Sequence, residues 1–228
     1  MNLTDALAAA LDLLATWDSR VVAAVSVSLE VALLATLLAT LLGAPLGFAI
    51  ATGRSRGSRV VEVALNTATA LPTVVVGLLV YSLLSRRGPL GAWELLYTRS
   101  AMVIGETLLI TPLMAALTVA LVSGADPRIR ETALTLGASR FGAAWTVLRE
   151  LRRGALAAVA TGFGRLISEL GVALMVGGNI ENSTRTMTTA IALETGKGEF
   201  ALALALGFIL LGVALLVNIG AAAVTGTR

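Results

Sequence analysis

Hydrophobic residues along this chain gather in five long runs separated by short polar segments. The runs span about Val21–Thr52, Val60–Leu84, Ala101–Ser123, Ala155–Val176 and Phe200–Val224. A helix needs about 20 mostly apolar residues to cross the hydrocarbon core of a bilayer. The pattern therefore predicts an all-α integral membrane protein with about five transmembrane helices. The first run is too long for one upright helix, so it must tilt, bend near Pro45 or extend beyond the bilayer.

The ends and loops leave no room for a separate soluble domain. Residues 1–19 have leucines at helical spacing and carry acidic but no basic residues before Arg20. A signal peptide needs a positive n-region, so we expect a short amphipathic helix at the membrane surface. The longest polar stretch, 124–154, is too short for a packed core. We therefore treat 1–228 as a single transmembrane domain.

Composition excludes several function classes. The chain is 57% hydrophobic and only 14% charged, whereas soluble domains are about 25% charged. It contains no cysteine and no histidine, which argues against a disulfide, a thiolate metal site or a Ser/His/Asp enzyme. The basic residues are dispersed, which argues against nucleic-acid binding. We expect membrane lipid as the solvent, no bound metal ion and no catalytic residue.

The Lys and Arg residues of the loops predict the orientation, because cytoplasmic loops carry the excess of basic residues. With the N-terminus outside, the inner segments hold ten: Arg54, Arg56, Arg59, Arg128, Arg130, Arg140, Arg149, Arg152, Arg153 and Arg228. The outer segments hold six: Arg20, Arg86, Arg87, Arg99, Arg185 and Lys197. Arg86 and Arg87 weaken the bias. The compact clusters at 54–59 and 149–153 still favour an N-out, C-in topology with the 124–154 loop in the cytoplasm.

That loop carries signals for two short helices. Asp126 and Pro127 are typical of a helix start, Gly137 can end the helix in a left-handed conformation, and Ser139 can cap the next helix. The second helix would present an apolar face: Phe141, Ala144, Trp145, Leu148 and Leu151. An interfacial helix anchored by Trp145 would explain this second helix alone. It would explain neither the first helix nor the hinge, so we favour a docking surface for a soluble partner.

Charged residues within the runs are costly in a bilayer and usually face protein or water. Arg165 and Glu169 are four residues apart in the fourth run, so a helix places them on one face, close enough to pair. We favour a structural ion pair, and a charge beside the pathway or dimer seam is the alternative. Glu30 and Glu106 are expected at helix–helix contacts or interfaces.

The second run contains hydroxyls and a proline within two turns. Pro72 leaves the carbonyl four residues back without its helical partner, and threonine side chains can compensate. Two compatible interpretations remain open, a kinked helix with satisfied hydroxyls and a pore-lining stretch with a gate. The candidate pathway residues are Thr69, Pro72, Thr73 and Gly77.

The Glu-x-Ala-x-x-x-Gly spacing at Glu131, Ala133 and Gly137 resembles the cytoplasmic coupling motif of binding-protein-dependent ABC import permeases. In that family the first helix of the motif sits in a groove of the ATPase. The resemblance assigns ATPase coupling to nine residues: Arg130, Glu131, Thr132, Ala133, Leu136, Gly137, Ala138, Ser139 and Arg140. The family pattern often continues to a Leu-Pro, whereas here Leu148 is followed by Arg149.

Residues 71–77 and 163–199 resemble the molybdate, tungstate and sulfate permeases, with the tungstate branch closest at 184–199. The resemblance implies a multi-pass subunit of the plasma or inner membrane that moves an oxyanion by alternating access. Tungstate ranks first, and molybdate or sulfate are the alternatives. Implied partners are a second copy of this chain, two ATP-binding cassette ATPases that hold ATP and Mg²⁺, and an extracytoplasmic binding protein.

Two further function classes compete with this interpretation. An ATPase in its own right is disfavoured, because Gly196-Lys197 is followed by Gly198 rather than Ser or Thr and no P-loop is present. A non-ABC structural membrane subunit remains the alternative. Co-purification with an ATPase would separate it from a permease.

The topology is testable with single cysteines, since the chain has none of its own. We expect Ser58→Cys to be shielded from an impermeant thiol reagent in intact cells and Asn182→Cys to react. The physical reason is the basic bias of the 54–59 and 128–153 segments. The reverse labelling pattern would overturn the orientation and the cytoplasmic position of the 124–154 loop together.

Overall fold

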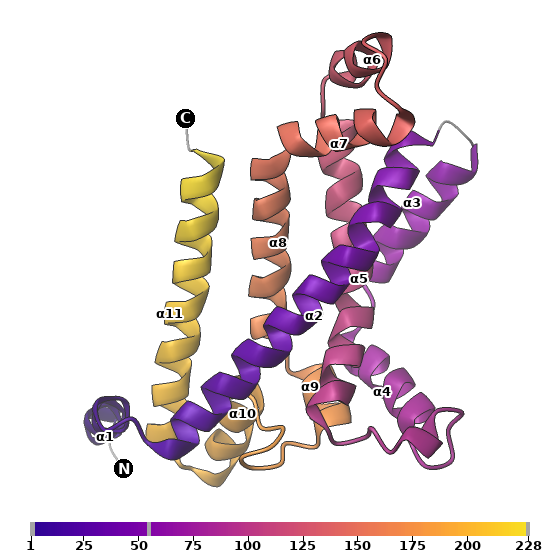
Figure 1. Cartoon of the computed structure of the whole chain (residues 1–228). Coiled ribbons are helices and arrows are strands. Elements are labelled where there is room, and N and C mark those ends of the chain that lie inside the picture. Colours follow the sequence, from indigo (N-terminus) through magenta and orange to yellow (C-terminus); the bar gives the residue numbers. More distant parts are fainter. Residues whose placement is uncertain (1–2, 54–55, 227–228) are drawn as a thin grey trace.

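The computed structural model describes residues 3–53 and 56–226, which fold into a helical bundle (Figure 1). Arg54 and Arg228, which were counted for the orientation, lie outside these residues. The elements are α1 (Leu3–Ala15), α2 (Ser19–Thr52), α3 (Arg56–Thr69), α4 (Thr73–Leu84), η1 (Gly91–Trp93), α5 (Arg99–Ser123), α6 (Pro127–Thr135), α7 (Arg140–Glu150), α8 (Arg152–Ile167), α9 (Gly171–Gly177), α10 (Met187–Lys197) and α11 (Phe200–Thr225).

Three helices are long and apolar enough to cross a membrane alone, namely α2, α5 and α11. Two further spans are bent pairs: α3 meets α4 at 94° and α8 meets α9 at 58°. The predicted number of about five spans holds if each pair is one span. The kink considered at Pro72 is present as a sharp break, whereas no break was predicted in the fourth run. Pro72 disfavours a helical conformation of the residue before it, and residues 168–170 separate α8 from α9.

The α2 helix crosses the bundle diagonally and packs along α5 (Figure 1). It runs unbroken through Pro45 for 34 residues, or roughly 50 Å at 1.5 Å per residue. Tilt and extension beyond the bilayer therefore accommodate its length. Small residues permit the close crossing: a Cβ on Gly43 would lie 2.8 Å from the carbonyl oxygen of Thr111, and one on Gly47 would collide with the Ala115 carbonyl.

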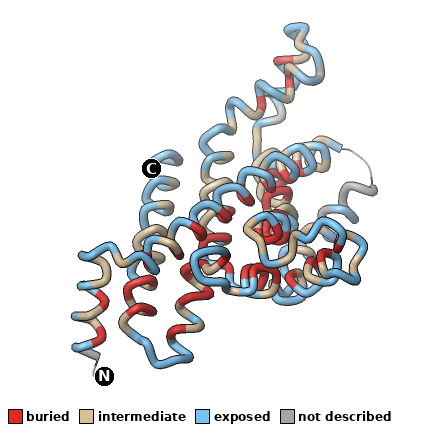
Figure 2. The backbone as a smooth tube through the Cα atoms, turned by 60° about the horizontal axis from the view of Figure 1, so that its bottom comes forward, coloured by how far each residue is buried: buried red, intermediate tan, exposed pale blue. Residues whose placement is uncertain are grey.

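Buried residues concentrate where α2, α5, α9 and α10 meet (Figure 2). The C-terminal half of α11 and the α6–α7 segment are mainly exposed. The expected N-terminal helix is present as α1, which packs on α11 with Ala6 and Ala10 buried and Leu11 exposed. Long rows of leucines on α2, α4 and α11 are also exposed. This apolar surface suits lipid or another apolar chain.

Candidate coupling and translocation site

A helical hairpin, α6 and α7, projects from the end of the bundle where α2 and α5 end and α8 begins (Figure 1). The predicted start is confirmed, because the Asp126 carboxylate accepts a hydrogen bond from the Arg128 amide at 2.9 Å. The turn after α6 is a Schellman motif: the Gly137 N–H donates to the Leu134 carbonyl, and the Ala138 N–H donates to that of Ala133.

The predicted left-handed glycine and second cap are also present. Gly137 has φ +87°, and no atom lies within 4 Å of where its Cβ would be. The conformation of the backbone, rather than crowding, therefore requires glycine here. Ser139 Oγ accepts from the Gly142 amide at 3.1 Å and starts α7. The two short helices are thus joined by a defined turn rather than by a loose loop.

The hairpin exposes large apolar side chains. Leu136 is 82% exposed, Phe141 80% and Trp145 62%. The α7 residues that pack against protein are instead Ala143 and Val147, so the predicted apolar face is not the one that anchors α7.

Among the nine coupling candidates, Ala133 is buried and Ala138 is half-buried. Arg130, Glu131, Thr132, Leu136, Gly137 and Ser139 are exposed on one hairpin. Arg140 is the first residue of α7, and its side chain lies outside the part that the structure describes.

The two broken spans meet at their breaks. A Cβ on Gly171, the first residue of α9, would lie 3.0 Å from the Val74 amide nitrogen and would collide with Thr73 Oγ1. Farther along, a Cβ on Gly77 would lie 3.0 Å from that of Met175. The α4 and α9 helices therefore begin at the same place and run side by side. Three of the four pathway candidates lie on α4 or at its start, and Thr69 ends α3 on the other side of the break.

A single carboxylate holds the second break together. Glu169 Oε1 accepts hydrogen bonds from the amides of Gly171 at 2.8 Å and Val172 at 3.3 Å, which are the first two residues of α9. Its Oε2 pairs with Arg165 Nη1 at 2.7 Å, so the predicted ion pair is present. The Glu169 side chain is 2% exposed and that of Arg165 42%. Thr188 Oγ1 of α10 also donates to the Glu169 carbonyl at 2.7 Å.

At the first break, between α3 and α4, the hydrogen bonds are made by backbone and threonine groups rather than by a carboxylate. The Pro72 carbonyl accepts from the amides of Val75 and Val76, and Thr69 Oγ1 donates to the Asn66 carbonyl at 2.7 Å. Pro72 has no side chain that can cap α4. The first N–H groups of α4 therefore carry the partial positive charge of a helix start without a carboxylate beside them.

Glu30 and Glu106 lie at helix–helix contacts, as expected. Glu30 of α2 pairs with Arg99 at the start of α5. Glu106 is buried in α5, and its Oε2 has no hydrogen-bond partner within the described chain. Sequence reasoning missed the cap that Glu169 forms on α9 and the part played by Thr188. The approach of α10 that brings Thr188 there is a tertiary contact with no local signal.

The chain is similar to a known family of membrane transport proteins. The family described as "binding-protein-dependent transport system inner membrane component" matches residues 20–225. The tungstate uptake system permease protein of Peptoclostridium acidaminophilum is 37% identical over 210 residues, which cover 92% of each chain. The corresponding protein of Campylobacter jejuni is 40% identical over 160 residues, covering 70% of this chain and 67% of that protein.

A solved structure supports the same fold. The bacterial alginate ABC transporter in complex with a pentasaccharide-bound periplasmic protein contains a chain that superimposes with a TM-score of 0.70. The match covers 95% of this chain and 84% of that chain at 19% identity. At this identity the likeness concerns the fold alone.

The Glu169 contacts generate a double-mutant prediction. Arg165→Met strands a buried carboxylate, so we expect it to lower thermal stability in detergent more than Arg165→Met combined with Glu169→Gln. Glutamine keeps an oxygen that can accept from the amides of Gly171 and Val172. The double variant with Glu169→Gln should therefore be more thermally stable than the one with Glu169→Leu. The expected coupling between the two sites is about 0.5–3 kcal/mol. Strictly additive effects would mean that the two side chains do not interact.

Proposed function

This chain belongs to the family of binding-protein-dependent transport system inner membrane components, and from that premise we propose that it is the membrane-spanning subunit of an ATP-driven tungstate importer. The assignment of tungstate as the substrate rests on the 37–40% identity to two tungstate uptake permeases, one of them matched over 92% of its length. The N-terminal start of α4 near the two breaks suits the passage of an anion.

The proposed assembly has two copies of this chain. Three single spans and two broken ones are too few to enclose a path for a polyatomic ion, whereas a two-fold pair could do so. The exposed leucine rows of α2, α4 and α11 supply apolar surface for a partner copy or lipid. Two ATPase chains that bind ATP and Mg²⁺ and an extracytoplasmic binding protein complete the complex. This chain itself is non-catalytic in the proposal.

The hairpin is the proposed ATPase dock. Glu131 and Thr132 of α6 and the C-cap residue Leu136 are exposed. The Schellman turn and the Ser139 cap join α6 to α7 in a defined geometry. This arrangement supports coupling better than a plain interfacial helix, because a lipid anchor requires neither α6 nor its turn. The N-out, C-in orientation belongs to the proposal, because it places the hairpin in the cytoplasm with the ATPases.

The proposed pathway passes the paired breaks. Thr69, Thr73 and the α4 N-terminus offer hydroxyl and backbone donors, and Gly77 allows α4 to lie close to α9. Such donors can replace part of the hydration of a dianion without holding it tightly, which a transient pathway requires. Arg165 is partly exposed beside the second break. Because Glu169 pairs with it, we assign it a structural role rather than tight anion binding.

Coupling can be tested on Gly137. Valine adopts φ +87° poorly, at a cost of about 1–2 kcal/mol, so Gly137→Val should distort the turn while the spans stay inserted. Glu131→Arg should reverse the charge at one exposed position of the docking surface. We expect both to weaken ATPase binding or to uncouple ATP hydrolysis from uptake. The matched control is Gly142→Ala in α7, where an added Cβ meets only ordinary contacts. Normal substrate-stimulated hydrolysis in both variants would exclude the docking role.

The substrate is tested in proteoliposomes that contain the whole complex, driven by ATP and supplied by its binding protein. We expect uptake of tungstate first and molybdate second. Sulfate uptake alone would keep the oxyanion class and reject the tungstate branch. Uptake of a sugar or an amino acid without any oxyanion would refute the proposal.

A further inference from the structure

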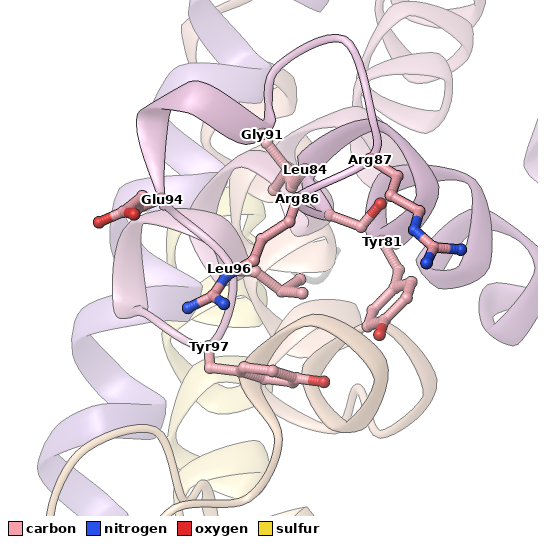
Figure 3. A pocket seen from close by; sticks show the side chains of 9 residues that line it. Tyr81, Leu84, Arg86, Arg87, Gly91, Glu94, Leu96 and Tyr97 are labelled. Atoms are coloured by element: carbon pink, nitrogen blue, oxygen red, sulfur yellow. The ribbon is translucent and has the colours of Figure 1, made fainter.

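A cavity of about 710 Å³ lies at the end of the bundle opposite the α6–α7 hairpin, where α4 ends and the chain turns towards α5 (Figure 3). Arg86, Arg87 and Glu94 line it together with Tyr81 and Tyr97. We call this cavity and its lining the mouth cup. Figure 3 shows the two tyrosine hydroxyls near each other, with the Arg86 and Arg87 guanidinium groups on either side of them.

The charges of the mouth cup are unusual for this end of the molecule. Four other basic residues on the same side each have an acidic partner: Arg20 with Asp18, Arg99 with Glu30, Arg185 with Glu181, and Lys197 with Glu194. Arg86 and Arg87 form no ion pair or side-chain hydrogen bond with any residue that the structure describes. Basic residues on the outer side also oppose the charge bias of membrane proteins. These two arginines are therefore available to an anion from outside the chain.

The loop that carries these arginines is closely built. A Cβ on Gly88 would collide with the Ser82 carbonyl, and one on Gly91 with the Ser85 carbonyl. Glu94 and Tyr97 both have positive φ, +49° and +65°. Residues other than glycine hold such conformations only where the surroundings enforce them, often at functional sites.

The two tyrosines of the mouth cup are the only tyrosines of the chain. Their ring centroids are 6.4 Å apart, with the planes at 61°. The neighbouring Tyr81 side chain raises the pKa of Tyr97. A phenol of ordinary pKa is already protonated at neutral pH and can donate a hydrogen bond. The cavity therefore combines hydroxyl donors and two guanidinium groups with the single carboxylate of Glu94.

The mouth cup also lies at the far ends of the two half-helices. The Tyr97 amide donates to the Val176 carbonyl of α9 at 2.9 Å, and the Tyr97 ring covers Gly178. The 12 residues of α4 separate the cup from the junction of the breaks by roughly 18 Å. A solute that follows α4 and α9 outward from the breaks thus arrives at these donors.

We propose that the mouth cup is a low-affinity capture site for the transported tetrahedral oxyanion, which holds the dianion after its release at the outer face. The inference rests on the proposed transport function and adds a site to it. The cavity is far larger than one such ion, so the ion keeps much of its hydration and many contacts are mediated by water. Weak binding of this kind lets an ion enter a pathway and still move on.

The two tyrosines provide the test. The full-length chain is produced with ¹³C-labelled tyrosine ring carbons and placed in nanodiscs built from unlabelled scaffold protein, so it gives signals from two residues only. Titration with sodium tungstate should shift at least one signal along a saturable curve, with sodium chloride at equal ionic strength as reference. Arg86→Gln with Arg87→Gln should weaken this binding at least about tenfold. Arg86→Lys with Arg87→Lys should retain part of it.

The matched control is Arg152→Gln with Arg153→Gln at the opposite end of the bundle, which should leave the titration unchanged. A shift that does not saturate, an equal response to chloride, or a titration unaffected by the Gln variants would overturn the capture site. A parallel titration adds the binding protein without its ligand. Signal shifts in this titration alone would also overturn the capture site, because the arginines would then contact an acidic protein surface rather than an oxyanion. ATP-driven tungstate uptake by the complete wild-type complex is measured in parallel, so failure of the site and failure of the transport function are distinguishable.

Discussion

A helix that breaks inside a bilayer must find new partners for the backbone groups that the break releases, because hydrocarbon supplies none. This constraint governs the centre of the molecule, where two spans break side by side. At the first break the Pro72 carbonyl accepts from two amides of α4. At the second, the Glu169 carboxylate accepts the first two amides of α9. The carboxylate in turn requires Arg165, since an isolated buried charge is costly. The ion pair is therefore a consequence of the break.

The breaks also dictate where small residues lie. The α4 and α9 helices can start together only because Gly171 and Gly77 leave room for Thr73 and Met175. The same requirement recurs where α2 crosses α5, at Gly43 and Gly47. In a membrane, lipid is as apolar as leucine, so close van der Waals packing rather than hydrophobic burial favours helix association. The large side chains are correspondingly left on the outer surfaces of α2, α4 and α11.

Local signals predicted much of this structure. The Asp126 start, the left-handed Gly137 and the Ser139 cap are each encoded within a few residues, and the pairing of Arg165 with Glu169 follows from helical spacing alone. The features that the sequence did not predict depend on contacts with distant segments. The run at 155–176 is apolar apart from a few residues, and helical spacing explains its charges as the Arg165–Glu169 pair, so periodicity could not reveal that Glu169 would cap a new helix. The packing face of α7, Ala143 and Val147, is set by the bundle beneath it. Arg86 and Arg87 were visible only as exceptions to the charge bias until the fold placed them beside both tyrosines.

The α7 and α8 helices share Leu151 as their common boundary residue, with no loop between them. The 16 residues of α8 then lead directly to the Glu169 break. Each residue turns a helix by about 100°, so one residue inserted into α8 would rotate the ion pair away from α9 or swing the hairpin around the bundle. The packing at both ends of α8 therefore constrains the number of residues in this segment as well as their identity. Divergence among transporters built this way should proceed there by substitution, while insertions and deletions accumulate at the termini and in the loops beyond it.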